Sequence, residues 1–176
     1  PEETLSIYLD TLKTMDSTQM GNYLGLESLL NTSDSAKNSI ASALVEQVHK
    51  CLDYQITSCD IQSYNAIVTA EVTTFDSASI LSDYQNSRDA YLSSVDAVID
   101  GSSKRYEHSL ELLLDSINNN TSTVTSSVTF HLFNDGVSWK LLENSEALGN
   151  AIFGTLSTTP VPADPDSAIE DDDAEQ

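Results

Sequence analysis

Apolar side chains recur along this chain with two different periods. Residues 2–14 and 34–52 place them three or four positions apart, which predicts two amphipathic helices, and a shorter helix is expected near residues 17–24. Residues 54–75 alternate with a period of two, and Ser63-Tyr64-Asn65 divides this stretch as a turn. The first half of the chain is therefore predicted to form helices followed by a β-hairpin.

The predicted hairpin has two distinct faces. In its first strand, Tyr54, Ile56 and Ser58 alternate with polar neighbours. The second strand is rich in β-branched residues, with Ala66, Val68, Ala70, Val72 and Thr74 on one face and Ile67, Thr69, Glu71, Thr73 and Phe75 on the other. Alternation alone does not decide which of these two faces is covered by helices.

Helical spacing returns in residues 77–118, where Gly101-Ser102-Ser103 interrupts it and predicts a helical segment in two parts. The positions that hold this spacing include Leu81, Tyr84, Tyr91, Leu92, Val95, Val98, Ile99, Tyr106, Leu110, Leu113 and Ile117.

A second hairpin and a last helix close the pattern. Residues 124–132 alternate, and Asn134-Asp135-Gly136 predicts a tight turn because these residue types tolerate positive φ. Val137, Trp139 and Leu141 are expected to share one face of the returning strand, with Trp139 anchored in the core. An apolar helix is predicted from about residue 145 to residue 156.

The order of elements predicts an α+β fold, in which an antiparallel sheet of about four strands, made of two hairpins, packs against helices. We expect one domain over residues 1–158. Residues 159–176 are interpreted as an acidic tail rich in proline and aspartate outside that domain, and Asp171-Asp172-Asp173 there favours solvation over a calcium site because no closed loop surrounds it.

Charge excludes some function classes. The 176 residues contain 28 acidic and 7 basic side chains, for a net charge of −21. Nucleic acids and anionic membrane surfaces both require clustered lysine and arginine, so neither is an expected partner of the folded domain.

The chain has no apolar run of about 18 residues that would span a membrane. It begins at Pro1 without methionine, which we interpret as a trimmed or mature form, and the abundant serine, threonine and asparagine suit a secreted or surface protein.

Several segments resemble a group of lipoproteins of Gram-positive bacteria. The resemblance rests on residues 8–13, on the strand at 65–73, on the helical insertion at 77–118 between the hairpins, and on the closing residues 135–156. It implies a nuclear transport factor 2-like (cystatin-like) cone, in which helices fill the concave side of a curved antiparallel sheet. It also implies a location outside the cytoplasm, with a membrane attachment only through an N-terminal lipid anchor that this sequence lacks.

Candidate chemistry is sparse. The three histidines, His49, His108 and His131, fall on polar faces, and Glu107, His108 and Glu111 lack the HExxH spacing of a zinc site. Cys51 and Cys59 are interpreted either as a disulfide or as two idle thiols, and a helix end followed by a strand disfavours the bridge. We find no motif for a nucleophile, a metal or a cofactor.

Two kinds of residue remain as candidate ligand contacts. Glu71 would have a raised pKa if its strand face lined a concave pocket, and would be an ordinary surface carboxylate if that face met solvent. Tyr84, Tyr91 and Tyr106 could line a cavity for an apolar or sugar-like ligand, or could be core residues.

The favoured function is a non-catalytic domain outside the cytoplasm that binds a small ligand or a protein partner. One alternative is a small isomerase or dehydratase that uses a cavity carboxylate such as Glu71. A second alternative is a scaffold or oligomerisation module. The fold by itself cannot choose among the three.

Overall fold

The computed structural model describes residues 1–30, 34–142 and 145–157. Their elements are α1 (Glu2–Leu12), α2 (Ser17–Leu24), α3 (Glu27–Leu30), α4 (Ser35–Cys51), β1 (Asp53–Gln62), β2 (Asn65–Phe75), α5 (Ser77–Leu92), α6 (Val95–Ile99), α7 (Ser102–Asn118), β3 (Thr123–Asn134), β4 (Trp139–Leu141), α8 (Ser145–Phe153) and the 3-10 helix η1 (Gly154–Ser157). This order confirms the predicted α+β class. The predicted tail at 159–176 lies outside the described residues.

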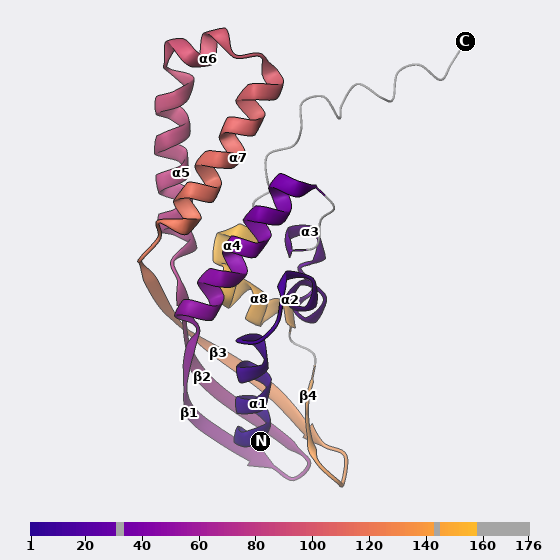
Figure 1. Ribbon diagram of the computed structural model, residues 1–176. Helices are drawn as coiled ribbons and strands as arrows, with labels where there is room; N and C mark the ends of the chain where they lie inside the picture. Colours follow the sequence, from indigo (N-terminus) through magenta and orange to yellow (C-terminus); the bar gives the residue numbers. More distant parts are fainter. Residues whose placement is uncertain (31–33, 143–144, 158–176) are drawn as a thin grey trace, which may run out of the picture.

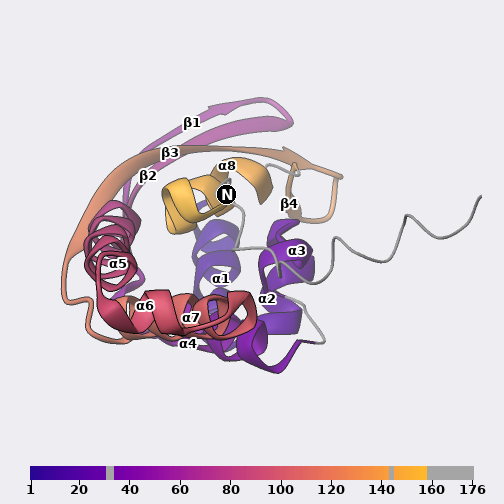
Figure 2. The same cartoon turned by 90° about the horizontal axis from the view of Figure 1, so that it is seen from above.

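The sheet is antiparallel, and its described strands lie in the order β1-β2-β3-β4. Val68 of β2 pairs with Cys59 of β1 and with Phe130 of β3. Figure 2 shows the sheet as an arc around α1 and α8. On β2, the face that carries Val68 is buried and the face that carries Glu71 is exposed, so the helices cover the alanine- and valine-rich face. Twist and pleat together therefore give one apolar concave side and one polar convex side.

A bulge in β1 changes one of the predicted inward positions. The register with β2 shifts between Ile56 and Ser58, so that Cys59 instead of Ser58 continues the face begun by Tyr54 and Ile56. The bulge leaves Thr57 of β1 without a partner on β2. Every residue after it is therefore shifted by one position, and Cys59 lies on the same side as Ile56. The prediction of Ser58 on the Tyr54 face was therefore wrong, because a strict period of two cannot anticipate an inserted residue.

Large side chains fill the concave interior. Leu5, Leu9 and Leu12 of α1 are fully buried, and the Phe75 and Phe153 rings meet edge to face with 5.8 Å between centroids. Phe130 of β3 is 1% exposed within the same cluster. The concave side of the sheet is thus packed with side chains from the described helices and strands.

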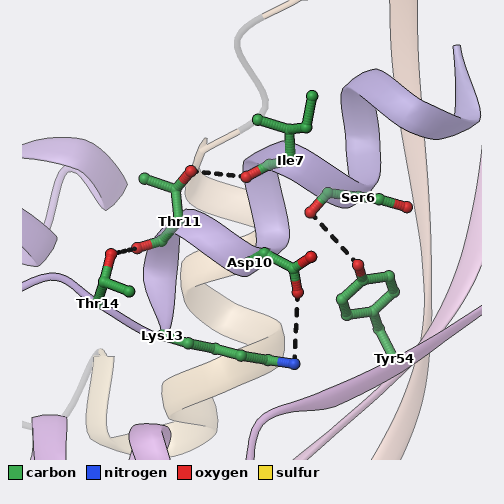
Figure 3. Close-up of polar contacts among 7 residues, drawn as sticks. All are labelled: Ser6, Ile7, Asp10, Thr11, Lys13, Thr14 and Tyr54. Atoms are coloured by element: carbon green, nitrogen blue, oxygen red, sulfur yellow. Dashed lines mark hydrogen bonds and ion pairs between the residues drawn. The ribbon is translucent and has the colours of Figure 1, made fainter.

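The contact between α1 and β1 at the edge of the sheet is partly polar (Figure 3). The Tyr54 hydroxyl donates a hydrogen bond of 3.3 Å to the backbone carbonyl of Ser6. Lys13 Nζ lies 3.5 Å from Asp10 Oδ1 and 5.3 Å from the centroid of the Tyr54 ring. These contacts join α1, which lies on the concave side, to the edge strand β1, with a cation over an aromatic face.

The closing hairpin forms where it was predicted, through a loop of four residues. Asn134 pairs with Trp139, Asp135 accepts hydrogen bonds from the backbone N–H groups of Val137 and Ser138 at 2.9 Å each, and Gly136 has a φ of 93°. Trp139 is half-buried against the core, as expected. Val137 belongs to the loop and is 92% exposed, so the prediction that it shares the strand face was wrong. The Asp135 side chain lengthens the turn by binding these N–H groups itself.

Helices α5, α6 and α7 form an arm that extends beyond the end of the sheet (Figure 1). The arm begins at Asp76, whose carboxylate accepts hydrogen bonds from the N–H groups of Ala78 and Ser79 and caps α5. At its other root, the buried Gln47 of α4 donates a 2.7 Å hydrogen bond to the Ile117 carbonyl in the last turn of α7. Gly101 is the N-cap of α7, so a break forms where it was predicted, and the chain reverses across α6 between this break and a second one at Ser93 and Ser94 (Figure 1).

Candidate functional site

The outer end of the arm exposes apolar side chains. Val95, Val98 and Ile99 of α6 are 75%, 81% and 77% exposed, and we call these three residues the tip patch. Ser94 caps α6 by accepting a hydrogen bond from the Ala97 N–H, and the Ala97 side chain is buried toward the arm. Single exposed valines are common on protein surfaces, but three within five residues of one helix concentrate apolar surface at one place.

A groove adjoins the tip patch, between α6 and the first turns of α7. Its volume is about 440 Å³. Its walls are formed by Tyr91, Asp96, Ile99, Asp100, Lys104, Glu107, His108 and Glu111. We call it the acidic groove, because four of these side chains are carboxylates and one is a lysine.

Tyr91 lines the acidic groove and contacts two other residues of its wall, Asp100 and His108. Its hydroxyl donates a 2.8 Å hydrogen bond to Asp100 Oδ2, and its ring lies 4.3 Å from the His108 ring, centroid to centroid. Partial burial, the hydrogen bond to Asp100 and the charge of that carboxylate raise the pKa of Tyr91, while the charge of Arg105 opposes the rise. The phenol therefore stays neutral at physiological pH and acts as a hydrogen-bond donor.

The remaining carboxylates differ in how they are engaged. Glu111 Oε2 lies 3.1 Å from His108 Nδ1. Within residues 1–30, 34–142 and 145–157, no group of three His, Cys, Asp or Glu side chains is arranged to hold a metal ion. Glu107, His108 and Glu111 are thus not arranged as a metal site there, and the groove is an acidic surface hollow with one lysine.

The four residues singled out from the sequence do not converge. Tyr91 lies in the acidic groove. Tyr84 is 8% exposed within the core, and burial raises its pKa. Tyr106 is half-buried against the core, with a hydroxyl that has no hydrogen-bond partner among the described residues. Glu71 is exposed on the convex face of the sheet, opposite the helices. The concave-pocket environment considered for Glu71 is therefore not found, and the isomerase or dehydratase alternative loses the carboxylate it named.

The other candidate groups lie apart from the groove. His49 Nε2 is 3.0 Å from the backbone carbonyl of Met15, and His131 is exposed on β3. Cys51 and Cys59 are free thiols, both half-buried. These residues have local structural contacts and do not face a common hollow, so they add no catalytic arrangement.

Sequence reasoning missed half of the groove. Asp96, Asp100 and Lys104 were not singled out, and Ile99 was interpreted only as part of an apolar stripe. The helical reversal at Gly101 brings them together with Tyr91 and His108, which are 17 residues apart in the sequence. The signal available in the sequence was the break at Gly101-Ser102-Ser103, because an antiparallel pair of helices places residues on either side of such a break next to each other.

None of the helices described here combines the length and the apolar character needed to cross a membrane. No protein-family model matches the chain, and no curated protein matches it either.

A solved structure does share the fold. It is the crystal structure of a putative lipoprotein, ycdA, from Bacillus subtilis subsp. subtilis str. 168, with a TM-score of 0.60 and 19% sequence identity. The match covers 85% of this chain and 55% of that one, so the present chain corresponds to little more than half of the Bacillus protein. At this level of identity the similarity establishes a common lipoprotein-like fold.

Proposed function

We propose that this protein is a non-catalytic domain of the bacterial cell surface that binds a protein partner through the end of its helical arm. The observation that carries the proposal is the tip patch, where Val95, Val98 and Ile99 are each more than 70% exposed. These side chains contribute little to folding in the free protein, and covering them would release ordered water. A partner is therefore the simplest reason to keep them at this position.

The fold supports a protein partner over a small ligand. The concave side, which in a nuclear transport factor 2-like cone could hold a ligand, is filled by Phe75, Phe130 and Phe153. The acidic groove is open at the surface of the arm, whereas small-ligand sites usually enclose most of the ligand. We also propose that the curved sheet and its helices form a nuclear transport factor 2-like cone.

The arrangement of the ends supports a surface location. The fold is shared with the putative lipoprotein of Bacillus subtilis, and the N-terminus lies at the opposite end of the molecule from α6 (Figure 1). A lipid anchor on the N-terminal side would place the sheet near the membrane and direct the tip patch away from it. The arm would then present its apolar end to other proteins of the cell envelope.

The proposal can be tested by photo-crosslinking in intact cells of the native host. A photoreactive amino acid in place of Val98 should give a discrete adduct with one partner. The same amino acid in place of Thr129, exposed on the convex face, is the matched control and should give no such adduct. Absence of an adduct at position 98, or the same adducts from both positions, would contradict the proposal.

A further inference from the structure

We infer that the partner segment bound at the arm is a cationic, amphipathic polypeptide whose apolar side chains pack on the tip patch and whose lysine or arginine enters the acidic groove. This inference rests on the proposed function and specifies the chemistry of the partner. The tip patch and the acidic groove adjoin each other, and two carboxylates of the groove have no partner among the described residues.

The apolar and acidic surfaces are continuous through Ile99. This side chain is 77% exposed as part of the tip patch and also lines the acidic groove. A single segment can therefore contact both surfaces if apolar and basic side chains lie close together along it. Interfaces of this kind combine an apolar centre with a polar rim, in which the charges select the partner.

Two carboxylates of the groove are available for an incoming cation. Asp100 accepts the Tyr91 hydroxyl and Glu111 faces His108. Asp96 and Glu107 are exposed, and within the described part of the chain their carboxylates make no hydrogen bond or ion pair. Lys104 is the one lysine or arginine among the groove residues. A guanidinium placed between Asp96 and Glu107 would replace water with charge-assisted hydrogen bonds.

Charge also disfavours the other occupants of an apolar patch. A second copy of this chain would bring an equally acidic groove to the interface, and both copies carry a net charge of −21. An anionic bilayer on the tip patch would be repelled by the same carboxylates, because the acidic groove adjoins the patch through Ile99 and salt screens only charges farther apart than about 8 Å. A basic polypeptide satisfies both surfaces at once.

The test uses the full chain and three fluorescein-labelled peptides of the same length. The first peptide combines leucine and arginine, the second has glutamate in place of every arginine, and the third has serine in place of every leucine. Fluorescence anisotropy should show binding of the first peptide and at least about tenfold weaker binding of the other two, a difference of about 1.4 kcal/mol. Raising the salt concentration should weaken binding of the first peptide.

Variants locate the binding site. The pair Val95→Ser and Val98→Ser, and separately the pair Asp96→Asn and Glu107→Gln, should each weaken binding of the first peptide by about tenfold or more. The matched control is Asp53→Asn with Glu71→Gln, which removes two carboxylates from exposed positions on the sheet and should leave affinity within about twofold.

Equal weakening by the control pair would mean general attraction to an acidic protein and would overturn the inference. Concentration-dependent self-association removed by the Val95 and Val98 substitutions, or binding to phosphatidylglycerol vesicles, would overturn it in favour of the other occupants. If a crosslinked partner forms at position 98 in cells while all three peptides fail to bind, the proposed function stands and the cationic partner is wrong.

Discussion

The concave interior of the sheet and the end of the helical arm contain similar apolar side chains in opposite environments. Phe130, Phe153 and Leu9 are at most 1% exposed, whereas Val95 and Val98 are at least 75% exposed. The interior side chains stabilise the fold because folding removes them from water. Those at the tip remain in water after folding, so their apolar surface is available for binding. Apolar side chains therefore stabilise the fold in the interior, whereas at the tip they stay exposed in the free protein.

The largest effect should follow from a cavity in the interior. Phe130→Ala should lower the free energy of unfolding by about 3–5 kcal/mol, because it removes a buried ring and leaves a void under the helices. Urea unfolding followed by the fluorescence of Trp139, the sole tryptophan of the chain, would measure it. A loss below about 1 kcal/mol would show that the interior is not closely packed.

A smaller effect should follow where the arm meets the body. Gln47→Ala should lower stability by about 1–3 kcal/mol, because it removes the buried hydrogen bond to the Ile117 carbonyl. Circular dichroism at 222 nm reports all helices, whereas Trp139 reports the body. We expect the helical signal of this variant to be lost at lower urea than the fluorescence signal. Coincident transitions equal to those of the exposed control Glu46→Ala would argue against this linkage.

The other root of the arm should make stability depend on pH. The Ser79 hydroxyl, aided by the N–H groups of Ser79 and Ala78, holds the pKa of Asp76 below its usual value, although burial opposes the shift. The folded pKa is thus lower than the unfolded one. The stabilisation by Asp76 should be complete above about pH 4 and should be lost as the pH falls through the folded-state pKa.

Two substitutions separate capping from charge at this position. Asp76→Ala should cost about 0.5–2 kcal/mol at pH 7. Asp76→Asn keeps a capping oxygen without a titratable group, so its difference from wild type should shrink toward pH 3 in urea titrations. A difference that stays constant with pH would assign no electrostatic role to Asp76.

The smallest effect is expected at the tip. Val95→Ser with Val98→Ser should change the free energy of unfolding by less than about 0.5 kcal/mol, because both side chains are already in water and serine and valine have similar helix propensities. The same urea titration as for Phe130→Ala would compare tip and interior directly. A loss of 2 kcal/mol or more would show that the tip patch is structural.

The sequence predicted the elements better than their environments. Alternation in residues 65–75 and 124–132 identified the two central strands, because a sheet covered on one side leaves a period of two. Helical spacing correctly placed Val95, Val98 and Ile99 in a helix but did not reveal that no neighbouring element of the described chain covers them. Periodicity reports which side chains share a face, and coverage of that face depends on where the chain reverses.

The same limit applies to the candidate site. Tyr91 was identified by its residue type, but its partners Asp100 and His108 become neighbours only through the reversal at Gly101. Glu71 was identified by its place among apolar neighbours, but the helices cover the other face of β2, so Glu71 faces solvent. Which face of the strand the helices cover depends on packing between segments that are far apart in the sequence. The alternation of residues within β2 does not determine it.

The most direct test of the central claim is a two-dimensional amide NMR titration of the full chain with the leucine–arginine peptide. We expect chemical-shift changes to be confined to residues 91–111, which include α6 and the part of α7 that lines the acidic groove. The strands β2 and β3 should be unaffected. Changes centred on the concave interior, or spread evenly over the acidic surface, would contradict the claim that the arm carries the binding site.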